Sequence, residues 1–200
     1  MGKIVKITDR VIRSLWRNGN PDKAVLSSAR GAATLVSRQA QSVWPVMLAS
    51  LDEDMLSQDG RPTYAETAVY AAIRFYAIHQ QGQAQFVYES VYEDDKEKGV
   101  SLFKALARLR SQPDRQDALD RRVKALLATS NVTSMIQSLS HLISLLKAAN
   151  PTIKIDYALL AQDLYDAQFG VSAANQVHLR WGQQYYWDIQ TEKLAEGKQN

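Results

Sequence analysis

The sequence predicts an all-α fold, a single compact bundle of roughly eight helices. Along most of the chain, apolar residues recur every three or four positions, which is the period of an amphipathic helix. Glycine and proline are few, and several of them begin or end these periodic stretches. One segment, FVYESVY, alternates like a strand, but no partner strand is evident elsewhere. With 200 residues the chain can bury a sizeable core. We expect one domain over residues 1–191 and a polar tail over residues 192–200.

Four amphipathic stretches are expected to form helices in the first half of the chain. They cover residues 3–17, 21–33, 44–56 and 63–80. The run NGNP ends the first stretch, and Pro21 suits the first turn of the second helix. Thr63 and Glu66 have the spacing of a capping box, which predicts the start of the fourth helix. Because the fourth stretch is strongly apolar, we expect it at the centre of the core.

The second half begins with an irregular region, residues 81–98, and is expected to form five more helices. They cover residues 99–110, 115–128, 132–149, 156–169 and 172–191. Asn150-Pro151 ends the third of these helices, and Gly170 follows the fourth as a C-capping glycine. In the first two, leucines at helical spacing make an apolar stripe beside a row of basic residues.

Composition argues against a secreted or membrane protein. Without cysteine, the chain has no disulfide framework, no thiolate zinc site and no cysteine nucleophile. The first residues alternate charge with apolar side chains, so we expect neither a signal peptide nor a membrane span there. No later stretch is long and apolar enough to cross a bilayer. We therefore expect a cytoplasmic protein.

No residue pattern indicates catalysis or metal binding. His79, His141 and His178 fall in separate predicted helices, and each is interpreted as an ordinary core or surface histidine. The carboxylate clusters at residues 52–54 and 93–95 lack the spacing of a calcium loop and are interpreted as solvated. Phosphate-cradling, dinucleotide-binding and nucleophile-elbow motifs are absent. We predict no enzyme activity, no metal site and no cofactor.

Four aromatic residues near the C-terminus have two interpretations. Trp181, Tyr185, Tyr186 and Trp187 could stack on bases, as in single-strand binders. Alternatively, they could anchor the core. Helical spacing and the size of the rings favour the core for Trp181 and Tyr185.

Positive charge is concentrated in two parts of the chain. Residues 1–40 carry a net charge of +6 and residues 99–126 carry +4, whereas the whole chain carries only +3. The cations beside the leucine stripes of the second part are Lys104, Arg108, Arg121, Arg122 and Lys124. Such stripes are compatible with simple solvation, partly compensated by acidic neighbours such as Asp117 and Asp120, or with a surface that holds a polyanion. The residue pattern alone leaves both interpretations open.

Several segments resemble those of one protein family in their order and spacing. They are GVSLFKALARL, DRRVKALLA, HLISLLKA, IDYALLAQDL and LRWGQQYYW. Another segment, AVLSSARGAA, resembles that family's N-terminal helix, which bears an arginine shortly before a glycine. The family is CasB, the small subunit of the type I-E CRISPR surveillance complex, Cascade. The resemblance covers most of residues 20–190.

This resemblance implies an all-α protein without catalytic activity. It implies contacts with other Cascade subunits, a second copy of the chain within the complex, and no membrane partner. It also implies sequence-independent binding of guide RNA and of single- and double-stranded DNA. In antiviral defence, such binding stabilises the guide RNA–target DNA hybrid and the displaced strand, which together form the R-loop.

The same resemblance indicates which residues hold nucleic acid. The candidates are Arg30, Lys104, Arg108, Arg121, Arg122 and Lys124. Arg30 matches the family's N-terminal arginine, and Lys104 matches its SLxxAL motif. Arg121 and Arg122 match its paired-arginine segment. Arg108 and Lys124 are their neighbours on the same helices. The chain departs from the family at Ile143-Ser144, where an arginine is common, and at residues 169–172, where basic residues are common. Those contacts are expected to be missing or moved.

Two other functions stay open at the level of sequence. The short helices joined by SQPD superficially fit a helix-turn-helix DNA-binding regulator. However, that turn contains a proline, and the second helix has few side chains that read base edges. The other alternative is a purely structural scaffold. Such a protein does not bind nucleic acid, so substitution of its basic residues would cause no DNA-binding defect.

Overall fold

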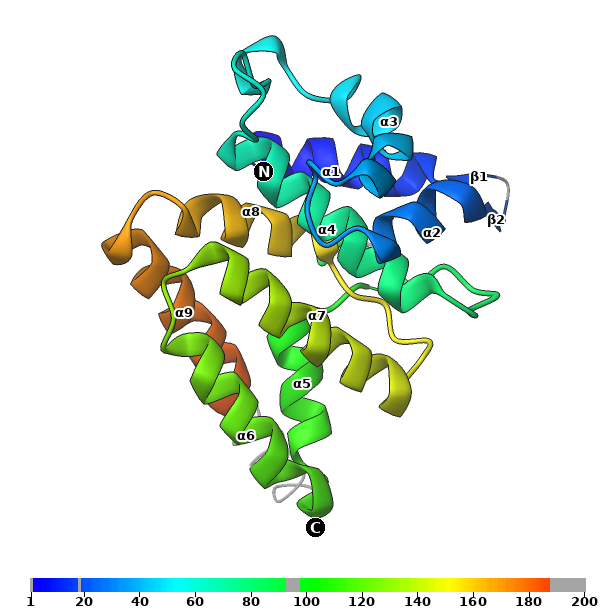
Figure 1. The fold of residues 1–200 in the computed structure, drawn as a ribbon. Helices are drawn as coiled ribbons and strands as arrows, with labels where there is room; N and C mark the ends of the chain where they lie inside the picture. Colours follow the sequence, from blue (N-terminus) through cyan, green and yellow to red (C-terminus); the bar gives the residue numbers. More distant parts are fainter. Residues whose placement is uncertain (1, 18, 93–97, 188–200) are drawn as a thin grey trace.

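Nine α-helices lie within the part of the chain that the computed structural model describes, residues 2–17, 19–92 and 98–187, so the predicted all-α class is confirmed (Figure 1). They are α1 (Lys3–Ser14), α2 (Lys23–Gly31), α3 (Trp44–Leu48), α4 (Tyr64–Gln80), α5 (Leu102–Arg110), α6 (Pro113–Leu127), α7 (Val132–Ala149), α8 (Tyr157–Ala167) and α9 (Val171–Tyr186). Two 3-10 turns, η1 (Arg38–Ser42) and η2 (Glu53–Met55), and a short ladder, β1 (Trp16–Arg17) with β2 (Asn20–Pro21), are the other elements. The predicted polar tail, residues 192–200, lies outside the described residues.

The structure corrects the boundaries of the first two predicted helices. The first helix ends at Ser14, because the chain then folds back as the β1–β2 hairpin. Gly19, at the tip, has a positive φ of 80°, which glycine adopts at little steric cost. Pro21 therefore lies in β2 and not in the first turn of α2. Helix α2 is instead capped by Asp22, whose side chain accepts a hydrogen bond from the backbone N–H of Val25 at 3.1 Å.

The predicted helix over residues 44–56 is wrong beyond Leu48. After α3 the chain forms a turn, becomes extended at Asp52 and then makes the separate 3-10 turn η2. Ser50 donates its hydroxyl hydrogen to the Val46 carbonyl at 2.9 Å, so this side chain competes for a backbone acceptor just where α3 has ended. The apolar periodicity of this stretch reflects a wrapped surface segment and not one continuous helix.

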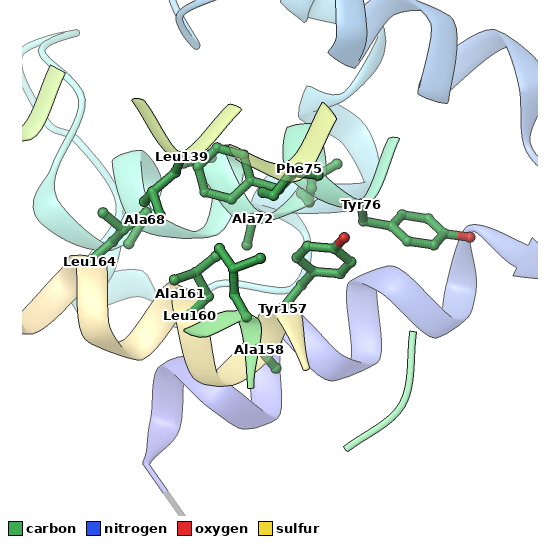
Figure 2. Packing of buried hydrophobic residues seen from close by; sticks show 14 of the residues in the cluster. Ala68, Ala72, Phe75, Tyr76, Leu139, Tyr157, Ala158, Leu160, Ala161 and Leu164 are labelled. Carbon is green, nitrogen blue, oxygen red and sulfur yellow. The ribbon is translucent and has the colours of Figure 1, made fainter. Parts of the chain in front are cut away.

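Helix α4 is the centre of the fold, as the sequence predicts. Its capping box is formed: the Thr63 hydroxyl accepts from the Glu66 N–H at 3.1 Å, and the Glu66 carboxylate accepts from the Thr63 N–H at 2.8 Å. Alanines on α4 and α8 allow the two helices to pack closely, as Figure 2 shows. The facing side chains in that view are Ala68, Ala72, Phe75, Leu160, Ala161 and Leu164.

The irregular region before α5 ties α8 to the rest of the core. Tyr88 and Val100 each form a parallel bridge with Ile155, directly before α8. Gly99 is required beside this crossing, because a Cβ there would lie 1.8 Å from the carbonyl oxygen of Glu89. The prediction of an irregular excursion holds for the described residues of this region, and residues 93–97 lie outside them.

His79 is a core histidine, as predicted, and it makes stability depend on pH. Its Nδ1 lies 2.7 Å from the Tyr157 hydroxyl and its Nε2 lies 3.1 Å from the Pro151 carbonyl. A carbonyl only accepts, so Nε2 carries the hydrogen and Nδ1 accepts from the tyrosine. Burial lowers the pKa of His79 to about 4. The folded state therefore favours the neutral imidazole.

Acidification is accordingly expected to remove stability that His79 contributes. Its folded pKa lies below the unfolded value near 6.5, so the contribution is complete above pH 6.5 and falls as the pH drops toward 4. Between pH 6.5 and pH 4 the free energy of unfolding should fall by roughly 3 kcal/mol on account of His79. Urea unfolding from pH 7 to pH 4 measures it, with the non-titrating variant His79→Gln as control. Equal pH dependence in both proteins would contradict this assignment.

Candidate nucleic-acid interface

Helices α5 and α6 form a hairpin, the α5–α6 hairpin (Leu102–Leu127), that presents cations on its outer side. Its leucine stripes belong to the core, except for the partly buried Leu127, and they pack against α7 and α9. The buried residues of the stripes are Leu102, Leu106, Leu109, Leu119, Val123 and Leu126. The exposed cations are Lys104, Arg108, Arg121, Arg122 and Lys124. Packing of one face therefore fixes the direction in which the other face displays its charge.

A clamp of charged and aromatic groups holds the α5–α6 hairpin against α9. Arg110 donates to both carboxylate oxygens of Asp120, at 2.6 and 3.0 Å, and so joins α5 to α6. The Tyr185 hydroxyl donates to the same carboxylate at 2.8 Å. The guanidinium also lies over the rings of Tyr185 and Tyr186, 5.5 and 5.3 Å from their centroids. Arg110 is thus committed to the fold.

This clamp shows which cation pairs with Asp120, and it differs from the pairing within α6 that the sequence suggested. Hydrogen bonding from Arg110, followed by that from Tyr185, lowers the pKa of Asp120 below its usual value. Asp120 is therefore neutralised across the hairpin by Arg110, and not by the arginines that follow it in sequence. The possible Asp117–Arg121 ion pair is not formed within the described residues.

Three cations of α6 remain on the exposed side. Arg122 donates to the Ala118 carbonyl of its own helix at 3.0 Å, which holds its side chain along the surface. Lys124 lies close enough to Asp120 that its charge also lowers the pKa of that carboxyl. Arg121 is exposed between them. The three side chains form a row of positive charge on a helix whose other face is buried.

The C-terminal aromatic residues divide into two groups. Trp181 and Tyr185 are fully buried, which confirms the core interpretation for both. Trp187 is 70% exposed. Together with Lys104, Gln183 and Gln184 it lines a surface hollow of about 430 Å³. A flat aromatic face beside an ammonium group and two amides can stack on an unpaired base and hold its phosphate.

Arg30 lies in a different setting, at the C-terminal end of α4. Its guanidinium is 3.5 Å from the Ala77 carbonyl, and the Lys147 ammonium donates to the Ile78 carbonyl at 3.0 Å. These are carbonyls of the last turn of α4, where the helix dipole favours positive charge. Burial, followed by the charge of Arg30, lowers the pKa of Lys147. Arg30 and Lys23 also line a hollow of about 710 Å³.

The structure thus separates the six candidate residues into two groups. Five lie on the α5–α6 hairpin, whereas Arg30 lies on α2, which packs against α4 and η1. Figure 1 shows α2 among the N-terminal helices and the hairpin in the opposite half of the molecule. Lys147, next to Arg30, was missed by sequence reasoning because 117 positions separate the two in the chain. No local spacing could have indicated that they meet.

The remaining sequence candidates do not form a second site among the described residues. His79 and His178 are buried, His141 is exposed, and no metal-binding cluster forms in the described part of the chain. The cluster at residues 93–95 lies outside it. Where the family commonly has an arginine, Ile143 is buried and Ser144 is exposed, so the one side chain that faces outward there carries no charge. No helix among the described residues has the length and hydrophobicity to span a bilayer.

A family model matches most of the chain, and two solved structures are similar to it. The sequence model of the family described as CRISPR-associated protein Cse2 matches residues 23–186. The structure is similar to the crystal structure of CasB from Thermobifida fusca, with a TM-score of 0.70, 25% identity, and coverage of 93% of this chain and 99% of that one. It also resembles in fold a chain of a CRISPR RNA-guided surveillance complex, with a TM-score of 0.66, 17% identity, and coverage of 96% and 99%. None of the curated proteins matches the sequence.

Proposed function

Because the chain belongs to the family of CRISPR-associated protein Cse2, we propose that it is the non-catalytic small subunit of a type I-E CRISPR surveillance complex, Cascade. In this role it binds guide RNA and single- and double-stranded DNA without sequence preference and stabilises the R-loop in antiviral defence. Its partners are the other Cascade subunits and a second copy of itself. It acts in the cytoplasm, without a cofactor. The observation that carries the proposal is the exposed row of cations on the α5–α6 hairpin.

The chemistry of this row suits phosphate contacts. Lysine and arginine bind phosphate oxygens in any sequence, and such contacts position a strand without reading its bases. The leucine faces keep the row in place, and Arg110 pairs with the Asp120 carboxylate across the hairpin. We assign phosphate binding to Arg121, Arg122 and Lys124, with Lys104 and Arg108 on the adjacent helix.

R-loop formation needs only a small contribution of this kind. The guide RNA–target hybrid is about as stable as the DNA duplex that it replaces, so the exchange is nearly balanced. Protein contacts to the backbones of the hybrid and of the displaced strand therefore shift the equilibrium. Trp187 beside Lys104 offers a stacking platform for the unpaired strand, and Arg30 with Lys23 offers a second cationic hollow on the other half of the molecule.

Reassembly of the complex with and without this chain tests the proposal. On a matched target duplex, the complex that contains the chain should hold its R-loop longer, and the benefit should not depend on the sequence of the displaced strand. Equal R-loop lifetimes with and without the chain would contradict the proposed role. A strong preference for one duplex over random DNA would instead support the helix-turn-helix alternative.

A further inference from the structure

A hollow of about 390 Å³, the Arg74 pocket, lies away from the α5–α6 hairpin. It opens between the segment that follows α2, the middle of α4 and the first half of α7. The residues that matter for its chemistry are Val36, Pro62, Tyr70, Arg74, Ile136 and Ser140. Its size is that of a pocket that encloses one or two side chains or a small ligand.

Arg74 lines this pocket without a carboxylate partner among the described residues. Its Nη1 donates to the Ser140 hydroxyl, and its Nε is buried without a hydrogen-bond partner. Ser140 donates its own hydrogen to the Ile136 carbonyl, and Tyr70 donates to the Ala32 carbonyl at 2.9 Å. Neither hydroxyl neutralises the guanidinium. Burial also lowers the pKa of Arg74, although arginine stays protonated in proteins.

The surroundings of Arg74 favour one kind of occupant. The walls are mostly apolar, and Val36 at the mouth is 62% exposed. A half-buried guanidinium with unused donors is best satisfied by a planar carboxylate, which it binds through two parallel hydrogen bonds. A nucleic-acid strand needs several cations along its path, whereas Arg74 is the one lysine or arginine in this lining.

From this combination of charge and apolar surface, we infer that the Arg74 pocket docks a partner protein through an acidic side chain next to an apolar one. The inference rests on the proposed function, because it takes the partner to be another subunit of the same complex. The carboxylate pairs with Arg74 at the floor, and the apolar side chain covers Val36 and Ile136. Removing either Arg74 or the partner's carboxylate leaves the other charge buried without a counter-charge.

Two kinds of variant test the docking site in the full chain. Arg74→Met should weaken association with the guide-RNA complex assembled from the other subunits at least about 30-fold, the loss expected when one partner of a buried charge pair is removed. Val36→Asp should weaken it more than Val36→Lys does, because both variants lose the apolar contact but only the negative charge repels the carboxylate. Val36 is exposed, so this matched pair keeps the test valid if Arg74→Met fails to fold.

Each outcome separates the docking site from the proposed function. If the unchanged chain does not join the complex, the proposed function fails and the inference fails with it. If the unchanged chain joins but Val36→Asp associates equally tightly, only the inference is overturned. It is also overturned if Arg74→Met loses affinity for random-sequence DNA alone, which would make the pocket a phosphate site. Loss confined to self-association, measured by analytical ultracentrifugation, would reassign the pocket to a second copy and overturn the choice of partner.

Discussion

Replacement of Arg121 and Arg122 by glutamate is expected to weaken binding to random-sequence duplex DNA roughly 60-fold at 0.1 M salt. Each cation that neutralises a phosphate releases about 0.9 of a condensed counterion, which at this salt concentration is worth about eightfold in affinity. Two lost contacts multiply to the expected factor, and the introduced carboxylates add repulsion. Fluorescence anisotropy with a labelled duplex measures the change.

A matched variant controls for the change in net charge. Lys6→Glu/Arg61→Glu alters the charge of the chain by the same amount, and both residues are exposed away from the α5–α6 hairpin, on α1 and in the loop before α4. Its affinity should stay within a few fold of the unchanged protein. If both double variants lose affinity equally, the effect is one of overall charge, and the hairpin is not the interface. If neither loses affinity, the chain is a scaffold.

The largest expected effect on stability is that of Trp181→Ala. Trp181 is fully buried, stacks on Phe103 with ring centroids 4.7 Å apart, and donates its indole N–H to Asp163 at 2.7 Å. Truncation creates a large cavity between α5 and α9 and removes one donor from a buried carboxylate. The free energy of unfolding should fall by about 3–5 kcal/mol. Denaturant unfolding followed by circular dichroism measures it.

Trp187→Ala, at the C-cap of the same helix, is the matched control for this truncation. Because Trp187 is 70% exposed, the free energy of unfolding should change by less than about 0.5 kcal/mol. Affinity for single-stranded DNA should nevertheless fall roughly fivefold or more, the effect of losing one stacked base. A normal single-strand affinity would remove Trp187 from the interface. A stability loss equal to that of Trp181→Ala would contradict the division between core and surface aromatics.

The helices that the sequence predicted best are those with a continuous apolar period and a defined cap. Thr63 and Glu66 marked the start of α4, and Asn150 marked the end of α7, because these signals act between neighbouring residues. The errors fell where local rules compete. Residues 44–56 keep an apolar period through a turn, and Pro21 suits the start of a helix as well as the end of a hairpin.

Prediction of the candidate site was limited by contacts between distant helices. The exposure of Arg121 and Arg122 followed from helical periodicity, since the leucine stripe fixes which face is buried. The pairing of Arg110 with Asp120 and the approach of Lys147 to Arg30 depend on how whole helices cross. Periodicity assigns a side chain to a face but not to a partner on another element.

The most direct test of sequence-independent phosphate binding is the salt dependence of the affinity of the purified chain for random-sequence single- and double-stranded DNA. The logarithm of the association constant should fall linearly with the logarithm of the salt concentration, with equal slopes for unrelated sequences. In the Arg121→Glu/Arg122→Glu variant this negative slope should become shallower by about 2. Binding that does not change with salt, or no detectable binding even in the assembled complex, would contradict the role assigned to the α5–α6 hairpin.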